Sequence, residues 1–371
     1  MSRHAHTPPI VALLLPSLGG GGMERVVLNL ARGMQEDGVS AELVVGWPEG
    51  PLLSTVPPEM AVTVLGHRRM AAALPALARY LRRREPYALV SSLDYANVVS
   101  LLARRVSRSR TRVVCTLHKP ISVATADSTL LRERLLLKRA VRMTYPRADA
   151  IVAVSSGIAD DLASTVNVPR NEISVIGNPV ISDGLLALSW APVSHPWFKT
   201  GAPPVILAVG RLTRQKDYPT MLRAFRRLHQ DVDARLMILG EGEDRAELEK
   251  LALALGVAEH TAFPGFVQNP YAYMRRSAVF AMSSIYEGLP TVMIEALACG
   301  VSVVSTDCPH GPREILDGGR YGRLVSVGDD VALSRALLDA LRSKATKLGE
   351  LRAAEYSVAA ATVAYRQLLG V

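Results

Sequence analysis

The stretch IVALLLPSLGGGGMER, residues 10–25, indicates the fold of the chain. Its apolar run, Ile10–Leu15, is too short to cross a bilayer and has the length of a buried strand. Glycines at 19–22 then separate this strand from a helical pattern. Glycines let a backbone approach a ligand, and the helix start that follows offers free N–H groups to an anion. Because position 24 is Glu, this is not the GxGxxG fingerprint of dinucleotide-binding proteins.

The same alternation of short apolar runs and longer helical patterns continues to the end of the chain. It is typical of α/β proteins with parallel sheets. In the first half, the predicted strands are Ile10–Leu15, Glu42–Val45, Ala88–Ser91, Arg112–Thr116, Ala150–Val154 and Ile173–Ile176. In the second half, they are Val205–Val209, Arg235–Leu239, Thr261–Pro264, Val279–Met282, Ser302–Ser305 and Gly322–Leu324. We therefore predict an α/β protein with two doubly wound, Rossmann-like sheets.

The length of 371 residues is about twice that of a typical domain, which indicates two domains. Residues 191–204 contain four prolines, and such a segment cannot form a helix or an inner strand. We therefore expect an N-terminal domain at 1–185, a linker at 186–204 and a second domain at 205–354. The helical pattern at 355–371 has apolar residues on more than one face, so another surface must cover it.

The composition, with 49% apolar and 21% charged residues, is that of an ordinary globular protein. Three cysteines without a CxxC pair argue against a disulfide framework and for a reducing compartment. No apolar run reaches the roughly 18 residues of a membrane span, and the N-terminus lacks a signal-peptide pattern. We expect a soluble, cytoplasmic protein that associates peripherally with the inner face of the cell membrane.

Basic residues are concentrated in one part of the chain. The formal net charge is +9, and residues 63–142 hold 17 Lys and Arg against 4 Asp and Glu. A solvated face explains this concentration, and so does a surface for anionic lipid headgroups, which attract each basic side chain by roughly 1 kcal/mol. We do not expect nucleic acid as a partner, because only 5% of the residues are aromatic and could stack on bases.

A loop with two cations follows the first predicted strand of the second domain. It contains Gly210-Arg211-Leu212 and Lys216. Open α/β sheets bind ligands at the carboxyl ends of their strands, where this loop lies. A guanidinium fork and a point charge a few residues apart suit a diphosphate. For this motif alone, two solvated loop cations are an equal interpretation.

A third motif, Ser284–Thr291, leads into a predicted helix at Val292–Cys299. Pro290 is suited to opening a helix, whose N-terminus points free N–H groups at a ligand. Glu287 lies in the loop, and Glu295 lies about one turn into the helix. Two carboxylates so placed suit the recognition of hydroxyl groups, although a buried or helix-capping Glu explains either one.

Together these motifs resemble one protein family. Glu287 and Glu295, with seven residues between them, form the EX7E pattern of the retaining glycosyltransferases of family 4. The other matching segments are GGMER (21–25), TLH (116–118), IGNPV (176–180), GRL with Lys216 (210–216), LGEG (239–242), PGFV (264–267), EGLP (287–290) and EALACG (295–300). Their order and spacing over nearly the whole chain are highly specific. TDCPHGPRE, residues 306–314, further resembles members that extend lipid-linked glycans and surface polysaccharides.

The resemblance implies the GT-B fold, in which two Rossmann-like domains face each other across a cleft that holds the active site. It implies that the helix at 355–371 packs back toward the N-terminal domain. The implied activity moves a hexose or N-acetylhexosamine from a nucleotide donor, expected to be UDP-linked, to a lipid-linked glycan or polysaccharide. The anomeric configuration would be retained, which gives an α-glycosidic bond. Neither a metal nor another cofactor is implied.

The resemblance also implies roles for particular residues. Those implied to bind the donor are Gly20, Gly21, Gly22, Arg211, Lys216, Gly265, Phe266, Val267, Glu287, Gly288, Leu289, Pro290, Thr291 and Glu295. Those implied to be catalytic are Glu287, His118, Arg211 and Lys216. His118 and Asn178 would meet the acceptor. Within this set, the two cations would neutralise the diphosphate, Glu295 would bind ribose hydroxyls, and Glu287 would contact the sugar.

The reaction must stabilise a leaving diphosphate, which cations and helix N–H groups do electrostatically. In the family, an oxygen of the donor phosphate is usually described as taking the acceptor proton on the same face of the sugar. No enzymic nucleophile is then needed. Glu287 is therefore not interpreted as a nucleophile of the kind that glycosidases use.

Two other functions stay open. A nucleotide-sugar 2-epimerase of the same fold would release a changed nucleotide sugar without an acceptor. A non-catalytic protein would use the basic segment to bind a membrane or nucleic acid. The intact set of Arg211, Lys216, Glu287 and Glu295 argues against a loss of activity.

Asp231-Val232-Asp233 matches DxD, the metal-binding motif of the other large glycosyltransferase fold. Because it precedes the predicted strand Arg235–Leu239, it lies at the amino edge of the sheet, and we interpret it as a solvated turn. Four further histidines have no ligand-like spacing: His67, His195, His229 and His260. His310 fits both a structural loop and a loop that faces the ligand.

Overall fold

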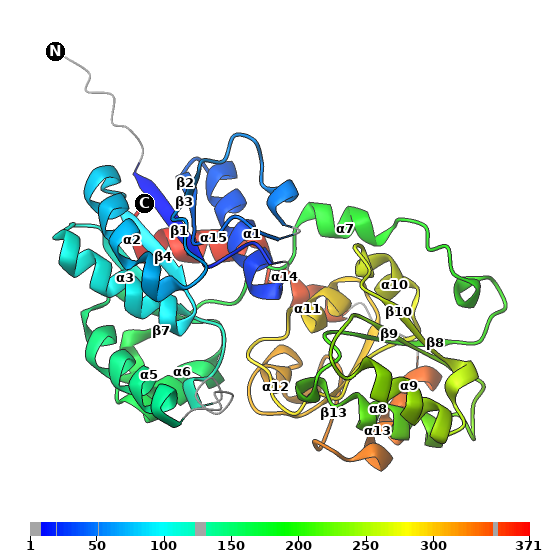
Figure 1. The fold of residues 1–371 in the computed structure, drawn as a ribbon. Helices are drawn as coiled ribbons and strands as arrows, with labels where there is room; N and C mark the ends of the chain where they lie inside the picture. Colours follow the sequence, from blue (N-terminus) through cyan, green and yellow to red (C-terminus); the bar gives the residue numbers. More distant parts are fainter. Residues whose placement is uncertain (1–8, 20, 51, 123–130, 344–347) are drawn as a thin grey trace. The chain divides into compact units, whose positions relative to one another are not determined.

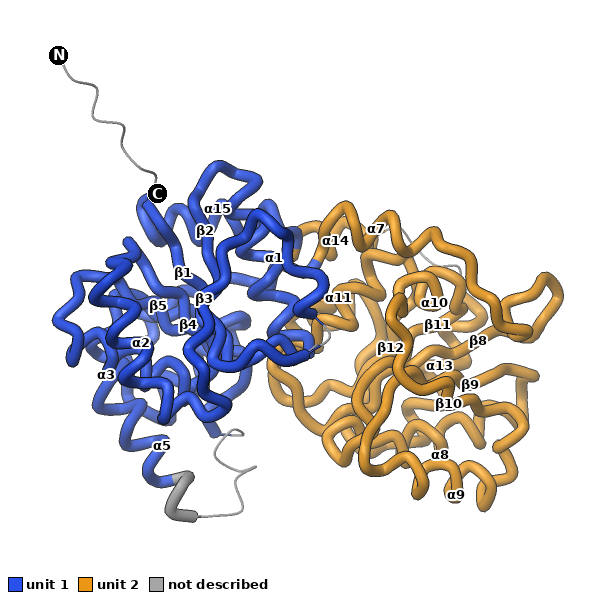
Figure 2. Tube along the Cα trace, turned by 45° about the horizontal axis from the view of Figure 1, so that its top comes forward, with its two compact units in different colours: residues 1–180, 357–371 blue, residues 181–356 orange. Residues whose placement is uncertain are grey.

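The computed structural model describes residues 9–19, 21–50, 52–122, 131–343 and 348–371. The chain forms two compact units, unit 1 with residues 1–180 and 357–371 and unit 2 with residues 181–356. Figure 2 shows unit 1 in blue and unit 2 in orange. Both units are α/β structures, as predicted.

The boundaries between the units differ from the expected ones, because the chain crosses after residues 180 and 356. Residues 186–204, which we expected to be a linker, belong to unit 2. The helix α7 (Asp183–Ser189) packs against α10 (Pro270–Arg276) of the same unit. The prediction was wrong because prolines exclude regular structure but do not prevent a segment from packing on a domain.

Within the described residues of unit 1, seven strands form one parallel sheet in the order β3-β2-β1-β4-β5-β6-β7. The strands are β1 (Ile10–Leu15), β2 (Ser40–Val45), β3 (Val62–Val64), β4 (Ala88–Ser92), β5 (Arg112–Leu117), β6 (Ala150–Ala153) and β7 (Ile173–Val175). Six match predicted strands. The edge strand β3 was missed because three residues with two exposed valines carry no periodic signal.

Helices cover both faces of this sheet. They are α1 (Gly22–Glu36), α2 (Met70–Arg84), α3 (Asp94–Ser107), α5 (Leu131–Thr144), α6 (Ser156–Val166) and α15 (Val358–Leu369). In β1, Val11, Leu13 and Leu15 pack with α1 and α15, whereas Ala12 and Leu14 pack with α2 and α3. Alternate residues of a strand point to opposite faces, so a strand covered on both faces is apolar throughout.

The C-terminal helix α15 is part of unit 1. Figure 1 shows α15, in red, beside the blue α1 and β1. Tyr365 and Leu369 of α15 are buried against the α1 face of the sheet. At its end, the Leu369 carbonyl accepts a hydrogen bond of 2.8 Å from the Tyr87 hydroxyl. An ion pair between Arg366 and Asp37 adds a surface contact.

The contact between α15 and α1 leaves no room for a side chain at Gly33 of α1. A Cβ placed there would meet Thr362 Oγ1 and would lie 2.5 Å from Val358 Cγ1. The helices can therefore approach closely only because residue 33 is glycine.

In unit 2, six strands of the described residues form a second parallel sheet in the order β10-β9-β8-β11-β12-β13. The strands are β8 (Val205–Val209), β9 (Arg235–Leu239), β10 (Thr261–Gly265), β11 (Val279–Met282), β12 (Ser302–Thr306) and β13 (Arg323–Val325). Besides α7 and α10, the helices are α8 (Tyr218–Leu228), α9 (Arg245–Ala254), α11 (Thr291–Ala298), α12 (Pro312–Ile315), α13 (Asp330–Arg342) and α14 (Leu348–Ala354). Helices α8, α9 and α13 share one core with the central strands.

The structure also shows the state of the cysteines and the character of the helices. All three cysteines, Cys115, Cys299 and Cys308, are free and buried. Among the helices of the described residues, none has both the length and the apolar character needed to cross a bilayer.

Replacing Gly33 with Leu should destabilise unit 1. Overpacking a tight contact costs about 1–3 kcal/mol, more than the roughly 1 kcal/mol that a helix gains when it loses a glycine. Denaturant unfolding of G33L should therefore show a lower free energy of unfolding than that of the parent. A71L, which adds the same side chain to an exposed site on α2, is the control. If G33L were as stable as A71L, α15 would not pack closely on α1.

Candidate functional site

The predicted donor-binding residues that are described in unit 2 lie in loops at one edge of the sheet, or in the helix α11 that follows one loop. The loop after β8 holds Arg211 and Lys216, and the loop after β11 holds Glu287. Because all six strands are parallel, their carboxyl ends lie at the same edge. Strands β8 and β11 are neighbours at which the strand order reverses, and such a point is where open α/β sheets bind ligands.

An ion pair joins the two loops. Lys216 Nζ lies 2.6 Å from Glu287 Oε1, and only 14% and 9% of the two side chains are exposed. The Ser284 hydroxyl donates a second hydrogen bond, of 2.7 Å, to the same carboxylate oxygen. In the described part of the chain, both of these donors reach Glu287 Oε1 and none reaches Oε2, so Oε2 is available to a ligand hydroxyl.

Backbone contacts hold the ion pair in place. The amide of Ile285 donates to the Gln215 carbonyl at 2.8 Å, and the Gln215 side chain donates to the Tyr286 carbonyl at 3.0 Å. Ser283 Oγ donates to the Lys216 carbonyl at 2.7 Å. The loops after β8 and β11 are thus fastened together on both sides of the ion pair, which fixes its geometry before a ligand arrives.

Arg211 lies in the same loop but in a different environment. Its side chain is exposed, and the guanidinium has no hydrogen-bond or ion-pair partner among the described residues. The loop backbone directly after Arg211 is held, because the amide of Leu212 donates to the Glu241 carbonyl at 2.9 Å. An unpaired guanidinium on an anchored loop is suited to a phosphate ligand.

Helix α11 begins at Thr291, directly after the loop that follows β11 and holds Glu287. Pro290 is its N-cap residue and supplies no side-chain hydrogen bond to the first N–H groups. Leu289 is buried and Gly288 is half-buried, which places their backbone beside the ion-paired loop. Glu295 is buried within the helix and has an interaction partner.

The predicted base-binding segment 265–267 begins with Gly265, the last residue of β10, and continues into the loop after it. Gly265 has φ +84°, and a Cβ there would lie 2.6 Å from Glu241 Oε1, so only glycine fits. Arg245 holds this arrangement through hydrogen bonds of 2.5 Å to Glu241 and 2.7 Å to the Phe263 carbonyl. Phe266 is 64% exposed and Val267 is half-buried.

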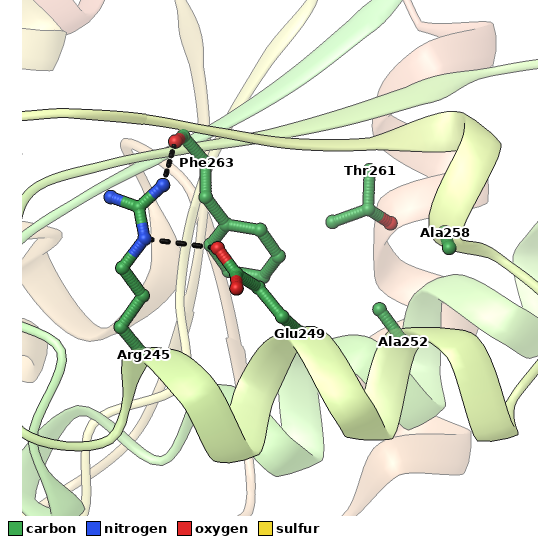
Figure 3. Close-up of a pocket in the computed structure, with 6 residues that line it drawn as sticks. All are labelled: Arg245, Glu249, Ala252, Ala258, Thr261 and Phe263. Carbon is green, nitrogen blue, oxygen red and sulfur yellow. Dashed lines mark hydrogen bonds and ion pairs between the residues drawn. The ribbon is translucent and has the colours of Figure 1, made fainter.

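A cavity of about 270 Å³ lies between α9 and β10. Figure 3 shows Arg245 and Glu249 at one end and Ala252, Ala258 and Thr261 at the other, with the Phe263 ring between them. None of its lining residues was a predicted site residue. Arg245 connects the cavity to the loop with Gly265, since it bonds both Glu241 and Phe263.

In unit 1, the glycine loop follows β1. Gly20 lies outside the described residues, so its predicted role has no structural counterpart here. Gly21 is the N-cap of α1 and Gly22 its first residue. The Glu24 carboxylate lies against Gly21, because a Cβ there would be 2.6 Å from Glu24 Oε2. A carboxylate at this helix start is stabilised by the helix dipole.

The predicted acceptor residues His118 and Asn178 lie next to each other in unit 1, His118 directly after β5 and Asn178 in the segment after β7. His118 Nε2 and Asn178 Oδ1 are both buried without a hydrogen-bond partner in the described structure. Burial lowers the pKa of His118 to about 4, against the opposing effect of Asn178. The imidazole is therefore neutral at pH 7, and its unpartnered Nε2 is available to a ligand.

A buried carboxyl group, Asp94, was missed by the sequence analysis. It follows β4, the neighbour of β1 at the point where the sheet order of unit 1 reverses. The Tyr145 hydroxyl donates to its Oδ1 at 3.1 Å, and burial raises the pKa of the carboxyl to about 6. The preceding residue, Leu93, has φ +84°, a strained value for a residue with a side chain. The available signal was an acidic residue directly after a buried strand.

The structure also corrects one expectation about histidines. His229 and His260, which have no ligand-like spacing in the sequence, lie with their ring centroids 4.0 Å apart. Asp233 of the DxD-like turn lies beside them. These residues come together because the connections before neighbouring strands meet at the amino edge of a parallel sheet, which sequence spacing does not reveal.

Family models match both halves of the chain. Residues 20–183 match the model described as Glycosyltransferase Family 4, and residues 195–356 match the model described as Glycosyl transferases group 1. Together with the two parallel α/β sheets, these matches confirm the predicted family and the GT-B fold class. The chain belongs to the glycosyltransferases of family 4.

Two relatives share about a third of their aligned residues with this chain. One is the N-acetylgalactosamine-N,N'-diacetylbacillosaminyl-diphospho-undecaprenol 4-alpha-N-acetylgalactosaminyltransferase of Campylobacter jejuni, 32% identical over 251 residues, which cover 66% of this chain and 64% of the relative. The other is the lipopolysaccharide core biosynthesis glycosyltransferase LpsE of Rhizobium meliloti, 33% identical over 235 residues, which cover 62% and 66%. The matched part therefore spans slightly less than two thirds of each relative.

A solved structure with the same fold is that of Anabaena Alr3699/HepE in complex with UDP. It superposes with a TM-score of 0.76 and 17% sequence identity, and the match covers 98% of this chain and 99% of that one. At this identity the likeness concerns the fold.

Replacing Asp94 with Asn should stabilise the protein at neutral pH. The folded-state pKa of about 6 lies above the unfolded value of 3.8, so stability is full below the unfolded value and falls as the pH rises through 6. Asn carries no charge, so D94N avoids the cost of burying an ionised carboxylate, and it can still accept the Tyr145 hydrogen bond. The free energy of unfolding should therefore rise by about 1–3 kcal/mol at pH 7.5. Denaturant unfolding should show D94N to be more stable than the parent at pH 7.5 but not at pH 4. The exposed Glu59 provides the control E59Q, and an equal gain in D94N at both pH values would refute the assignment.

Proposed function

We propose that this protein is a retaining glycosyltransferase. It moves a sugar from a UDP-linked donor to a lipid-linked glycan or polysaccharide acceptor and forms an α-glycosidic bond without a metal ion. The observation that carries the proposal is the buried pair of Lys216 and Glu287, in loops shared with Arg211 and joined to the start of α11. These groups lie at the carboxyl edge of the sheet, at the point between β8 and β11 where the strand order reverses. Open α/β sheets bind ligands at such points.

Arg211 and Lys216 bind the donor diphosphate. One is an exposed, unpaired guanidinium and the other a buried ammonium, and both are anchored through their loop backbones. The uncapped N–H groups of α11 add partial positive charge. Such fixed groups stabilise the charge that develops as the glycosidic bond breaks, and one of them is typically worth about 100-fold to 1,000-fold in rate. These cations take the place of a metal ion.

Glu287 and Glu295 recognise hydroxyl groups. Glu287 uses Oε1 to hold Lys216 and Ser284, and its Oε2 accepts a hydroxyl of the transferred sugar. Glu295, buried four residues into α11 from Thr291, binds the ribose. A carboxylate that is neutralised by an ammonium is a weak nucleophile, which supports a mechanism without a covalent glycosyl-enzyme intermediate.

The backbone of residues 265–267 contacts the nucleotide base. The positive φ of Gly265 turns the chain away from the β10 edge, and Glu241 and Arg245 fix the bend. The UDP complex of the Anabaena protein, which has the same fold, supports UDP as the nucleotide.

The acceptor hydroxyl binds at His118 and Asn178. His118 presents a buried, unpartnered Nε2 beside Asn178, and its lowered pKa keeps the ring neutral and able to accept a hydrogen bond. A base with a pKa of about 4 is too weak to remove the proton of a hydroxyl at pH 7. This supports a donor phosphate oxygen as the group that takes the proton, and His118 as the group that orients the acceptor.

The acceptor is membrane-borne, which is supported by the relatives named for a diphospho-undecaprenol acceptor and for lipopolysaccharide core biosynthesis. Helix α5 is the proposed contact with the inner face of the membrane. Leu135, Leu136 and Met143 of α5 are 61%, 66% and 59% exposed, and Arg139 and Arg142 between them are exposed too. Other members of the basic segment are engaged within unit 1, namely Arg84 with Glu42, Arg104 with Asp149 and Arg112 with the Leu369 carbonyl.

Replacing Arg211 with Ala should lower kcat/KM for the donor by about 100-fold, because one fixed cation is lost from the leaving group. Arg211 is exposed, so R211A should keep the parent melting temperature. K216A should lose activity as well, but it leaves Glu287 buried and unpaired and should be less stable. E295Q keeps the shape of the side chain and should lose donor affinity. The assay measures UDP release and glycan product with a UDP-sugar and a lipid-linked acceptor.

K250A, which removes a lysine from the exposed Glu247 pair, is the matched control. Full turnover in both R211A and E295Q would contradict the assignment. A strict requirement for Mg²⁺ or Mn²⁺ would contradict the metal-independent mechanism. Conversion of the donor alone to another nucleotide sugar would identify the epimerase instead.

Reversing the charge of Arg139 and Arg142 should reduce binding to anionic membranes. Each basic side chain near such a surface contributes roughly 1 kcal/mol, so R139E/R142E should co-sediment with anionic vesicles much less than the parent does. The control K199E/K250E makes the same change in net charge on exposed sites of unit 2. Equal binding of the parent to neutral and anionic vesicles would remove the electrostatic part of the proposal.

A further inference from the structure

Three potential metal ligands meet at the amino edge of the unit 2 sheet. His229 directly follows α8, Asp233 lies in the turn before β9, and His260 ends the short 3₁₀ helix Ala258–His260 before β10. Strands β9 and β10 are paired, with Thr261 opposite Leu236. Their starting residues are therefore neighbours, and the end of α8 comes back to the same edge. This edge is opposite the one that carries Lys216 and Glu287.

The three side chains are close enough to share one ion. One ring nitrogen of each histidine and one carboxylate oxygen of Asp233 all lie within 4.8 Å of one another. The two imidazole rings are 4.0 Å apart, centroid to centroid, at an interplanar angle of 39°. Within the residues that the structure describes, these form the single group of three such side chains that could hold a metal ion.

Both imidazoles carry an unsatisfied nitrogen. Nδ1 of His229 and Nδ1 of His260 are buried and have no hydrogen-bond partner in the described structure. Buried polar atoms are rarely left in this state, because each loses its hydrogen bonds to water. Two such atoms on adjacent rings are an observation independent of the three-residue geometry. A metal ion bound at these nitrogens would satisfy them.

The carboxylate is placed to complete the set. Asp233 is 66% exposed and pairs with Arg235 through Oδ1, which leaves Oδ2 for a metal ion. Carboxylates that bind metals are commonly held by such an outer hydrogen bond. Arg235 and Arg226 also add positive charge near His229, which weakens the attraction for a cation, and Asp233 offsets part of this charge.

We propose that His229, Asp233 and His260 form a binding site for a divalent transition-metal ion of the zinc class. Two imidazoles and one carboxylate suit Zn²⁺, whereas Mg²⁺ and Ca²⁺ prefer oxygen ligands alone. Ligand bonds of about 2.0–2.2 Å require the three atoms to move closer than they are, and the exposed Asp233 side chain can turn to allow this. Water fills the remaining position.

The site is separate from the residues proposed for sugar transfer. An ion held there would connect the end of α8 to the turn before β9 and to the start of β10. Binding to the folded state alone stabilises that state by mass action, so the ion should raise the melting temperature of the chain. It lies at the opposite sheet edge from the proposed donor site, and its binding can be measured without substrate.

The test is a calorimetric titration of the EDTA-treated, dialysed, untagged chain with Zn²⁺. We expect one equivalent to bind with micromolar affinity or tighter and the melting temperature to rise. Co²⁺ in place of Zn²⁺ should give the visible absorption of a four-coordinate site. Loss of a ligand should weaken Zn²⁺ binding at least about ten-fold, because the loss of even an outer partner of a metal ligand typically weakens binding by about 10-fold to 100-fold.

Two variants test the assignment to these residues. H260Q removes one imidazole, and D233N removes the carboxylate from an exposed turn, where the substitution does not threaten folding. Matched controls are H67Q, an exposed histidine of unit 1, and D231N, an exposed carboxylate of the same turn. Both controls should bind Zn²⁺ as the parent does. Absence of binding at one equivalent, or binding that H260Q and D233N leave unchanged, would overturn the proposal.

Discussion

A parallel sheet that reverses its strand order sends the two connections at the reversal to opposite faces, which leaves a crevice between them. In unit 2 this reversal lies between β8 and β11. Lys216 follows the first strand and Glu287 the second, so two groups 71 residues apart in the sequence form a buried ion pair. In unit 1 the reversal lies between β1 and β4, and the glycine loop and Asp94 follow these strands.

The ion pair is costly to bury, and its surroundings explain why it persists. Removing an ammonium and a carboxylate from water costs several kcal/mol each, which mutual attraction offsets only in good geometry. Here the hydroxyl of Ser284 adds a hydrogen bond, and backbone bonds between the two loops prevent the charges from separating. A pair held this rigidly needs little reorganisation when a charged ligand arrives, which is the condition for strong electrostatic stabilisation of a leaving group.

The two edges of the unit 2 sheet carry different chemistry. The carboxyl edge gathers cations, carboxylates and a helix start, all suited to a phosphorylated sugar. The amino edge gathers His229, Asp233 and His260, which suit a metal ion. The same rule of parallel strands produces both clusters. The DxD-like turn belongs to the second edge, and its likeness to a donor-binding metal motif was therefore a coincidence of spacing.

The sequence by itself determined most of the architecture. Apolar runs of strand length predicted twelve of the strands, most clearly the central ones, because a strand buried on both faces must be apolar along its length. The ordered motifs identified the family and predicted that Arg211, Lys216, Glu287 and Glu295 bind the donor together. Tertiary structure alone decided which of these side chains touch, that Asp94 is buried, and that residues 186–204 pack on unit 2. It also brought His229 to His260. Periodicity reports what each segment buries, whereas contacts between distant loops depend on strand order, which no local pattern encodes.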